Sequence, residues 1–539
     1  MTCCHPTRRQ VLRLASASAA MTGLLPFLER DRAQAAGVVV PMNLELVTLT
    51  ETSFVVTWYT AQPSIDGTRL APMPSDTVLM LGTSPTNLRT VIDRPDATPY
   101  HYAEVTGLEP GQTYYYAALS GGVPAVPSVF ASGNVVGTSV LDRANLSGPF
   151  VVTTPQPPPG EHLFSVALAN DVHMGETVAG LIATEPVVGG IPPGFSQVPG
   201  EPPYPLVMAQ AMVADARARG ADALLVAGDV TAEAAVVDVA HAHETLGAFG
   251  VYERDWHVTR GNHDRVHTGK PDTFKAGFFA DEHTWFSRDL FGMRVIGLDT
   301  YDKVGNGGDN GMLSAAQESW FDAELAKDRD VPTLVFGHHP ITLESTLVNV
   351  NAVRFDLQPQ QALRVEQQYA KTPGVFLHHA GHTHRTKRTV GTTATDVVFQ
   401  EVSSTKEYPG GFTMLRVFTG GYALNYYKTR SDLAREWSER TRQEDFTAYP
   451  YYVLGTTSDR NHVVKRDLSG LRKPSTPATS TSMTSTPPRR HRGAGGGAPA
   501  VSEPGGALAA TGLPAAAALA AGGLAAAGAL LTRCSGSGR

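Results

Sequence analysis

Five apolar runs in the central part of the chain each stop at a cluster of Asp, His or Asn residues, and this repeated pattern restricts the fold more than any other feature. The first run is 164–168 in "FSVALANDVHMGET", and Asp171 and His173 follow it. The other clusters close their runs in the same way: "AGD" at 227–229, "GNHD" at 261–264, "GHHP" at 337–340 and "GHTH" at 381–384. Short apolar runs of this kind are typical of buried strands, and ligands bind at the strand ends of open α/β sheets. We therefore expect all five clusters to meet at one site.

The stretches between these runs have helical patterning, for example at 206–220 and 234–250. Strands that alternate with helices predict an α/β region, which we place at 160–420. Residues 421–468 are predicted to extend this region and include a helical stretch. Residues 38–150 have β patterning instead, with alternation around Trp58 and a turn followed by a Tyr-rich strand. The sequence thus predicts an all-β domain ahead of an α/β domain.

The residue types in the five clusters indicate metal chemistry. Imidazole, carboxylate and amide oxygen ligands suit manganese, iron or zinc, and these clusters offer no thiolate. Asp171 and His173 are two residues apart, so on an extended strand they would point the same way and bind one metal together. So many ligands imply two metals. One carboxylate must then bridge them, because two cations roughly 3.5–4 Å apart repel strongly.

Together and in this order, the motifs D-x-H, G-D, G-N-H-D, G-H and G-H-x-H between about 164 and 385 resemble those of the calcineurin-like metallophosphoesterases. The resemblance implies a four-layer α/β/β/α sandwich. It also implies a ligand set: Asp171, His173 and His384 for one metal, Asp229 as the bridge, and Asn262, His338 and His382 for the other. We choose His338 over His339 because the family ligand usually stands two residues before the proline. The resemblance further implies that His263 faces the substrate and that Asp264 orients it through the other ring nitrogen.

The activity implied by this family is hydrolysis of phosphate monoesters or diesters by a hydroxide that bridges the two metal ions, with His263 as general acid. A small extracellular ester is the expected substrate. The formal net charge of −7 disfavours nucleic acid as the main partner. Two alternatives are a wall-displayed binding protein on an inactive phosphoesterase scaffold and an extracellular nuclease. Retention of all seven ligands and His263 argues against the first, and the lack of a long basic, aromatic-rich segment argues against the second.

The all-β domain at 38–150 resembles a fibronectin type III sandwich in the spacing of five residues: Leu108, Pro110, Gly111, Tyr114 and Tyr116. Purple acid phosphatases carry a similar domain before their catalytic domain. Their iron-bound tyrosine falls three residues after the bridging aspartate, where this chain has Ala232, and their first motif has Gly in place of His173. The resemblance therefore extends to domain order and not to the redox chemistry of their metal site.

Both ends of the chain have the composition of targeting segments. Residues 1–36 resemble a twin-arginine signal peptide, with Arg8 and Arg9 before an apolar stretch that ends near "AQAAG". Residues 469–507 are a Pro/Ser/Thr/Gly-rich linker. Residues 508–539 combine "LAATG", which resembles the LAxTG signal of actinobacterial-type sortases, with a bilayer-length apolar span and a basic end.

These segments predict an exported protein anchored to the cell wall, with the Tat translocase, a sortase and peptidoglycan as partners. A membrane tail anchor and plain secretion are the alternatives. All three cysteines, Cys3, Cys4 and Cys534, lie in the segments expected to be removed, so the mature protein would contain no disulfide. The N-terminal segment carries a net charge of +3 and the C-terminal segment one of +2, so their removal would change the net charge from −7 to −12.

Overall fold

The computed structural model of the 539-residue chain describes residues 39–63, 70–127, 148–180, 195–280, 282–304, 308–348, 357–442 and 449–474. The predicted signal peptide at 1–36, the sorting segment at 508–539 and all of the linker beyond residue 474 lie outside these ranges. Within the described ranges, no helix is long and apolar enough to cross a membrane. The described residues up to Pro474 belong to one compact unit.

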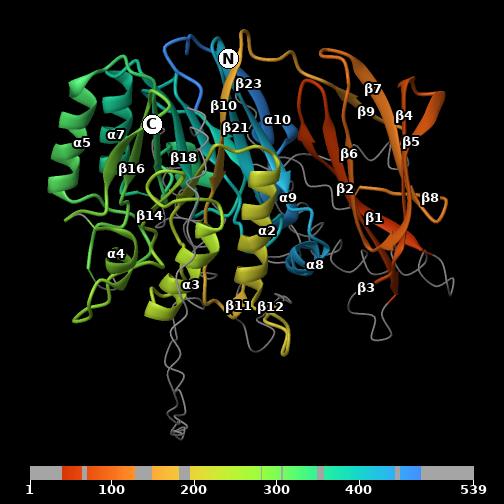
Figure 1. Ribbon diagram of the computed structural model, residues 1–539, viewed down its shortest axis with the longest axis horizontal. Helices are drawn as coiled ribbons and strands as arrows, with labels where there is room; N and C mark the ends of the chain where they lie inside the picture. Colours follow the sequence, from red (N-terminus) through yellow and green to blue (C-terminus); the bar gives the residue numbers. More distant parts are fainter. Residues whose placement is uncertain are drawn as a thin grey trace, which may run out of the picture. The chain divides into compact units, whose positions relative to one another are not determined.

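The N-terminal part is a sandwich of two antiparallel sheets, drawn in red to orange in Figure 1. One sheet holds β1 (Val40–Leu49), β2 (Phe54–Pro63), β3 (Leu70–Pro72) and β6 (Tyr100–Val105), and the other holds β4 (Ser75–Ser84), β5 (Asn87–Thr98), β7 (Thr113–Ser120), β8 (Val123–Pro124) and β9 (Phe150–Thr153). Trp58 is fully buried between them, stacks on His101 and donates its Nε1 hydrogen to Ser120 Oγ at 2.9 Å. The all-β prediction for this region is confirmed, and its last strand, β9, begins at the expected boundary of 150 and ends at Thr153.

The α/β part contains two six-stranded sheets. The first has the order β14-β13-β10-β21-β22-β23, in which β10, β13 and β14 are parallel and the others antiparallel. Its strands are β10 (His162–Ala169), β13 (Ala223–Ala227), β14 (Trp256–Thr259), β21 (Gly411–Phe418), β22 (Gly421–Lys428) and β23 (Asn461–Lys465). Every residue of β13 and β14 is buried, which explains why these strands are continuous apolar runs in the sequence.

The second sheet has the order β15-β16-β17-β18-β20-β19, with a parallel core from β16 to β20. Its strands are β15 (Phe286–Leu290), β16 (Met293–Leu298), β17 (Thr333–Gly337), β18 (Val375–Ala380), β19 (Lys387–Thr389) and β20 (Val398–Glu401). A separate pair, β11 (Val178–Ala179) and β12 (Phe195–Ser196), forms a small ribbon.

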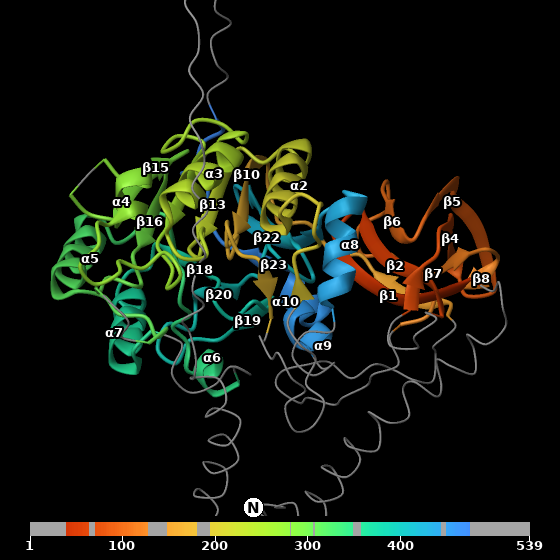
Figure 2. The same cartoon turned by 90° about the horizontal axis from the view of Figure 1, so that it is seen from below.

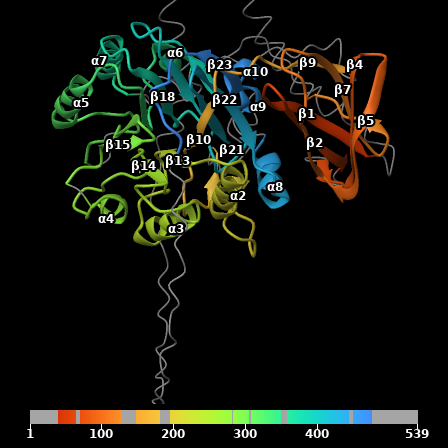
Figure 3. The ribbon, with the colours of Figure 1, turned by 45° about the horizontal axis from the view of Figure 1, so that its top comes forward.

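The two sheets pack face to face and helices cover their outer faces. One buried cluster joins strand residues of both sheets to side chains of α2 (Tyr204–Ala218), α3 (Val236–Gly247) and α4 (Thr273–Phe278). A second cluster joins the other face of the second sheet to α5 (Ala315–Lys327) and α7 (Pro359–Ala370). Figure 3 shows α5 and α7 on one side of the paired sheets and α2 and α3 on the other. The predicted four-layer α/β/β/α sandwich is confirmed.

The segment that the sequence sets apart as an extension, 421–468, supplies two strands of the first sheet, β22 and β23. The helices of this segment are α8 (Asp432–Thr441), α9 (Tyr449–Leu454) and α10 (Thr457–Arg460). Outside the segment, the short helix α6 (Leu343–Val348) precedes α7. Figure 2 shows α8 beside α2 and the sandwich strand β6, and both contacts are present in the structure. The boundary expected at 420 therefore falls inside the β21–β22 hairpin.

Candidate metal centre

The five polar clusters all follow strands directly and meet where those strands end. Asp171 and His173 follow β10, Asp229 follows β13 and Asn262 follows β14, all in the first sheet. The "GHHP" and "GHTH" clusters follow β17 and β18 of the second sheet. The site thus lies at the seam between two packed sheets, and the expectation of one shared site is confirmed.

The first group of side chains contains Asp171, His173 and His384. Asp171 Oδ1 lies 3.2 Å from His384 Nε2 and 3.7 Å from His173 Nε2. Asp171 Oδ1 and His173 Nε2 are both buried, and neither has a hydrogen-bond partner among the described residues. Such unpartnered electron-pair donors are costly in a protein interior. Their convergence on one point fits a bound cation.

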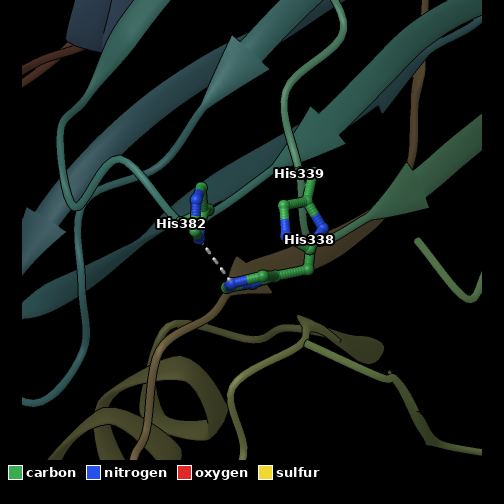
Figure 4. Close-up of side chains that lie close together, drawn as sticks. All are labelled: His338, His339 and His382. Carbon is green, nitrogen blue, oxygen red and sulfur yellow. Dashed lines mark hydrogen bonds between the residues drawn. The ribbon is translucent and has the colours of Figure 1, made fainter. Parts of the chain in front are cut away.

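The second group contains Asn262, His338 and His382. His338 Nε2 lies 3.0 Å from Asn262 Oδ1 and 3.2 Å from His382 Nδ1, a contact drawn as a dashed line in Figure 4. The other ring nitrogen of His338 is 2.9 Å from the carbonyl oxygen of Ala227, which directs Nε2 into the site. These neutral donors suit a second cation.

Asp229 lies between the two groups. Its Oδ2 atom is 3.4 Å from His173 Nε2 and 3.0 Å from His338 Nε2. A carboxylate in this place contacts both groups, as the bridging role predicted for Asp229 requires. The structure therefore brings all seven predicted ligands together, while their metal-binding roles stay predictions.

His339 lies beside His338, but its ring points in a different direction (Figure 4). Its hydrogen-bond partners also differ from those of His338. Its Nδ1 atom is 2.7 Å from Thr300 Oγ1, and its Nε2 atom is 2.9 Å from the carbonyl oxygen of Asp309. Both ring nitrogens are thus engaged away from Asp229. The geometry favours His338 as the ligand of this pair.

Five of the seven predicted ligands have left-handed backbone conformations: Asp171 (φ 49°), His173 (φ 49°), Asp229 (φ 47°), His382 (φ 66°) and His384 (φ 52°). This corrects the local reason for pairing Asp171 with His173. They do not alternate along a strand, since β10 ends at Ala169 and both follow it in irregular backbone. Asp, Asn and His tolerate this conformation better than other non-glycine residues, and such strain gathers at functional sites.

Two glycines allow the ligand loops to approach closely. A Cβ atom on Gly261 would lie 2.1 Å from Asp229 Oδ1, and one on Gly228 would lie 2.6 Å from the Cβ atom of His338. Gly228 also has a φ of +73°. The glycines of "AGD" and "GNHD" are therefore needed for the spacing of the ligands.

Comparison with known protein families matches residues 164–386 to the family described as calcineurin-like phosphoesterase. Residues 164–386 form a calcineurin-like phosphoesterase domain. The matched range contains every predicted ligand described above, and it ends two residues after His384.

One curated relative of the phosphoesterase domain is described as a probable glycerophosphodiester phosphodiesterase of Arcobacter nitrofigilis. It is 27% identical over 172 residues, which cover 31% of this chain. The match spans 59% of the length of that relative.

Solved structures with similar folds include a dimetal phosphatase from Danio rerio (15% identity, 49% of this chain and 96% of that chain, TM-score 0.37). A purple acid phosphatase from yellow lupin is 14% identical and covers 78% of this chain and 76% of its own (TM-score 0.34). A human fibronectin type III domain is 15% identical and covers 24% of this chain and 84% of its own (TM-score 0.15).

The charges of the phosphoesterase site compensate one another through its imidazoles. Burial alone would raise the pKa of Asp171, but positive charge on His384 and His338 holds it well below its usual value. Burial would lower the pKa of His384, but Glu407 and Asp171 raise it to about 9. Burial and the neighbouring His338 lower the pKa of His382 to about 3. Without metal ions, protons on some imidazoles thus balance the buried carboxylates, and metal ions would displace those protons.

His263 and Asp264 differ in part from the prediction. The His263 ring lies beside that of His173, with centroids 4.5 Å apart, so it does face the site. Its Nδ1 atom, however, is 2.9 Å from the carbonyl oxygen of Ala232 and not bonded to Asp264. The expected orientation of His263 by Asp264 is therefore wrong.

The Asp264 carboxylate instead accepts hydrogen bonds from three backbone N–H groups, those of Val230 (3.0 Å), Thr231 (2.8 Å) and Gly261 (3.1 Å). It also accepts one from Thr231 Oγ1 at 2.7 Å. Asp264 thus ties the loop that carries Asp229 to the loop that carries Asn262. A buried carboxylate prefers these donors because each one partly offsets its lost hydration.

The site predicted from the sequence leaves out three charged residues that lie next to the predicted ligands. Glu176 Oε2 lies 2.8 Å from His173 Nδ1, Glu407 contacts His384 Nδ1, and Lys406 lies between the two glutamates. Glu176 stands three residues after His173, so a carboxylate close behind the D-x-H motif was an available signal. Glu407 is 23 residues from His384, and no spacing in the sequence marks that contact.

Proposed function

We propose that this chain hydrolyses phosphoric esters with a pair of metal ions held by the seven ligands of the phosphoesterase domain. The observation that carries the proposal is the convergence of Asp171 Oδ1 and His173 Nε2 beside Asp229, which contacts both ligand groups. Both atoms are buried, and in the described part of the chain neither has a hydrogen-bond partner. Carboxylate, imidazole and amide donors suit manganese, iron or zinc ions. When bound, two such ions supply an activated water and neutralise charge on the phosphoryl oxygens.

His263 is the residue proposed to exchange a proton with the leaving group. Its contact with the Ala232 carbonyl oxygen requires a hydrogen on Nδ1, which leaves Nε2 to carry the exchanged proton. An alkoxide leaving group needs such a proton, because it is a strong base. No side-chain nucleophile is needed for hydrolysis of this kind.

The proposed substrates are small phosphate monoesters or diesters. The relative described as a probable glycerophosphodiester phosphodiesterase supports including diesters of glycerol among the candidates. The acidic charge of the chain supports a small ester over nucleic acid.

The test is a panel of paired monoesters and diesters, including nitrophenyl and glycerol esters, assayed on the mature protein after loading with manganese, iron or zinc. Metal content is measured on the same samples. We expect two ions per chain and hydrolysis that disappears on exhaustive chelation and returns with metal. Hydrolysis that persists without metal, or no hydrolysis of any ester by a fully loaded protein, would refute the proposal.

We also propose that the protein is exported by the Tat translocase and joined to peptidoglycan by a sortase. The sequence support is the Arg8–Arg9 pair, the "LAATG" motif at 508–512 and the apolar span and basic end behind it. Cleavage would fall between Thr511 and Gly512. Muramidase digestion of purified walls followed by mass spectrometry should yield peptides that end at Thr511 with wall fragments attached. An intact C-terminus at Arg539 in the membrane fraction would instead indicate a tail anchor.

A further inference from the structure

Lys406 is a buried lysine that lies between the buried Glu407 and the partly buried Glu176, next to the candidate metal centre. Its side chain is 5% exposed, and those of Glu176 and Glu407 are 15% and 1% exposed. Lys406 Nζ is 2.6 Å from Glu176 Oε1 and 2.7 Å from Glu176 Oε2, and 3.5 Å from Glu407 Oε2. Burying a lysine costs the free energy of hydration of its charge, and here the two carboxylates offset that cost.

The two glutamates contact the outer nitrogens of two different imidazoles. Glu176 Oε2 is 2.8 Å from His173 Nδ1, and Glu407 Oε1 contacts His384 Nδ1. The Nε2 atoms of both imidazoles face Asp171 Oδ1, at 3.7 Å and 3.2 Å. A carboxylate hydrogen-bonded to Nδ1 keeps the hydrogen on that nitrogen and leaves Nε2 free to bind metal, and Glu407 forms such a bond with His384. Glu176 lies beside His173 Nδ1 as a close ion-pair partner without hydrogen-bond geometry. Lys406 therefore connects the outer contacts of two histidines that are predicted to bind the same ion.

The backbone around Lys406 is fixed to the site and to the helix behind it. Its N–H group donates to the Asp171 carbonyl oxygen at 3.2 Å, and its own carbonyl oxygen accepts from Trp437 Nε1 at 2.9 Å. Ser404 Oγ donates to the same Asp171 oxygen at 3.2 Å. The lysine is thus held in register with the first ligand of the site.

We propose that Lys406 is a positioning residue for the metal ion bound by Asp171, His173 and His384, because it holds Glu176 and Glu407 against the two imidazoles. This inference rests on the proposed two-metal function. Two carboxylates that contact the same lysine away from bulk water would repel each other if the cation between them were removed. Without the lysine, at least one of them would move away from its imidazole, and that ring would lose its fixed orientation.

The test compares Lys406→Met, which keeps side-chain length without charge, with Lys406→Arg, which keeps the charge and the hydrogen bonds. The mature protein is freed of metal and titrated with Mn²⁺ and with Co²⁺. The number of bound ions, the affinity of each site and the visible spectrum of the Co²⁺ form are recorded. We expect Lys406→Met to weaken one of the two sites by about 10–100-fold, the usual effect of losing an outer contact to a ligand, and to leave the other unchanged. Lys406→Arg should restore most of the affinity.

Lys428→Met is the matched control, since Lys428 is also buried and its Nζ lies 2.6 Å from a single carboxylate, Glu45. It should lower thermal stability but leave both metal affinities unchanged. Glu176→Gln is a second variant that keeps the lysine, and it should weaken the same single site as Lys406→Met.

Unchanged or tighter binding of both ions by Lys406→Met and Glu176→Gln would overturn the positioning role. Equal weakening of both sites would overturn it as well, because that pattern indicates a general structural defect. Failure of the proposed function looks different, since the wild-type protein would then bind fewer than two ions or hydrolyse no ester.

Discussion

Asp229 Oδ2 lies 3.0 Å from His338 Nε2, across the seam between the two β-sheets. Asp229 follows β13 of the first sheet and His338 follows β17 of the second. The contact therefore exists only when the two sheets are packed correctly. This makes the predicted bridging carboxylate sensitive to the packing of the whole domain.

The first prediction concerns this carboxylate. Asp229→Asn removes the negative charge that contacts both ligand groups, so metal content and the rate of phosphate-ester hydrolysis should fall together. Metal analysis and activity are measured on the same sample at increasing metal concentrations. A variant that keeps two ions but loses activity would show that Asp229 acts in catalysis and is not needed as a bridge.

The second prediction separates proton transfer from metal binding. His263→Ala should keep both ions and slow turnover by about 10²–10⁴-fold, the usual cost of a lost general acid. The loss should be smaller for nitrophenyl esters than for alkyl esters, because nitrophenolate leaves without a proton. Loss of metal in proportion to activity would instead identify His263 as a ligand, which its place beside His173 and Asp229 also permits.

The third prediction follows from the corrected place of Asp264. Asp264→Asn turns an acceptor-only group into one that also donates, so it leaves some N–H groups of the Val230, Thr231 and Gly261 backbone unsatisfied. Each buried N–H group left without an acceptor lowers the free energy of unfolding by about 1–3 kcal/mol. Thermal stability and metal affinity should fall, and the loss of activity should be the same for nitrophenyl and alkyl esters. A leaving-group dependence like that of His263→Ala would restore a role for Asp264 in proton transfer.

The sequence predicts the position of the site well because each ligand cluster ends an apolar run. The burial that makes β10, β13, β14, β17 and β18 apolar also places their ends together. The layer order depends on a resemblance to a family, since periodicity alone does not distinguish one sheet from two.

The sequence predicts the contacts around the ligands poorly because they depend on the backbone. The family resemblance implied that Asp264 orients His263, but the Asp264 carboxylate lies among backbone N–H groups that no residue pattern reveals. The left-handed conformation of Asp171 and His173 was missed for the same reason. Glu407 is charged yet buried, and only its three-dimensional neighbours explain it.

The fourth prediction concerns colour. Ala232 offers its carbonyl oxygen to His263 and has no phenol group, so iron-loaded protein should lack the purple charge-transfer band of tyrosinate-bound ferric iron. Visible absorption of the iron-loaded wild type checks this. Ala232→Tyr is the matched variant, and a new visible band in it would place position 232 next to the metal. A strong band in the wild type would contradict the proposed ligand set.

A buried ion cluster joins the sandwich to the α/β part and gives the last prediction. Glu45 in β1 lies 2.6 Å from Lys428 Nζ and 2.5 Å from the hydroxyl of Tyr408, and it also contacts Arg442. Burial would raise the pKa of Glu45, but the charges of Lys428 and Arg442 lower it from 4.5 to about 2. Because the pKa is lower in the folded state, the stabilisation is complete above about pH 4.5 and is lost as the pH falls towards about 2.

Glu45→Gln removes the buried negative charge that Lys428 and Arg442 both contact, which should cost about 3–5 kcal/mol at neutral pH. The difference in unfolding free energy between wild type and variant should shrink as the pH falls from about 4.5 towards about 2, because protonation neutralises the wild-type carboxylate as well. Urea unfolding at several pH values, with chelator present so that metal loss does not contribute, measures this difference. Asp289→Asn is the control, since Asp289 pairs with Arg472 at the surface, where both side chains are more than half exposed, and should change stability by less than about 1 kcal/mol. A Glu45→Gln difference that stays constant down to pH 2 would show that Glu45 is not the ionised centre of this interface.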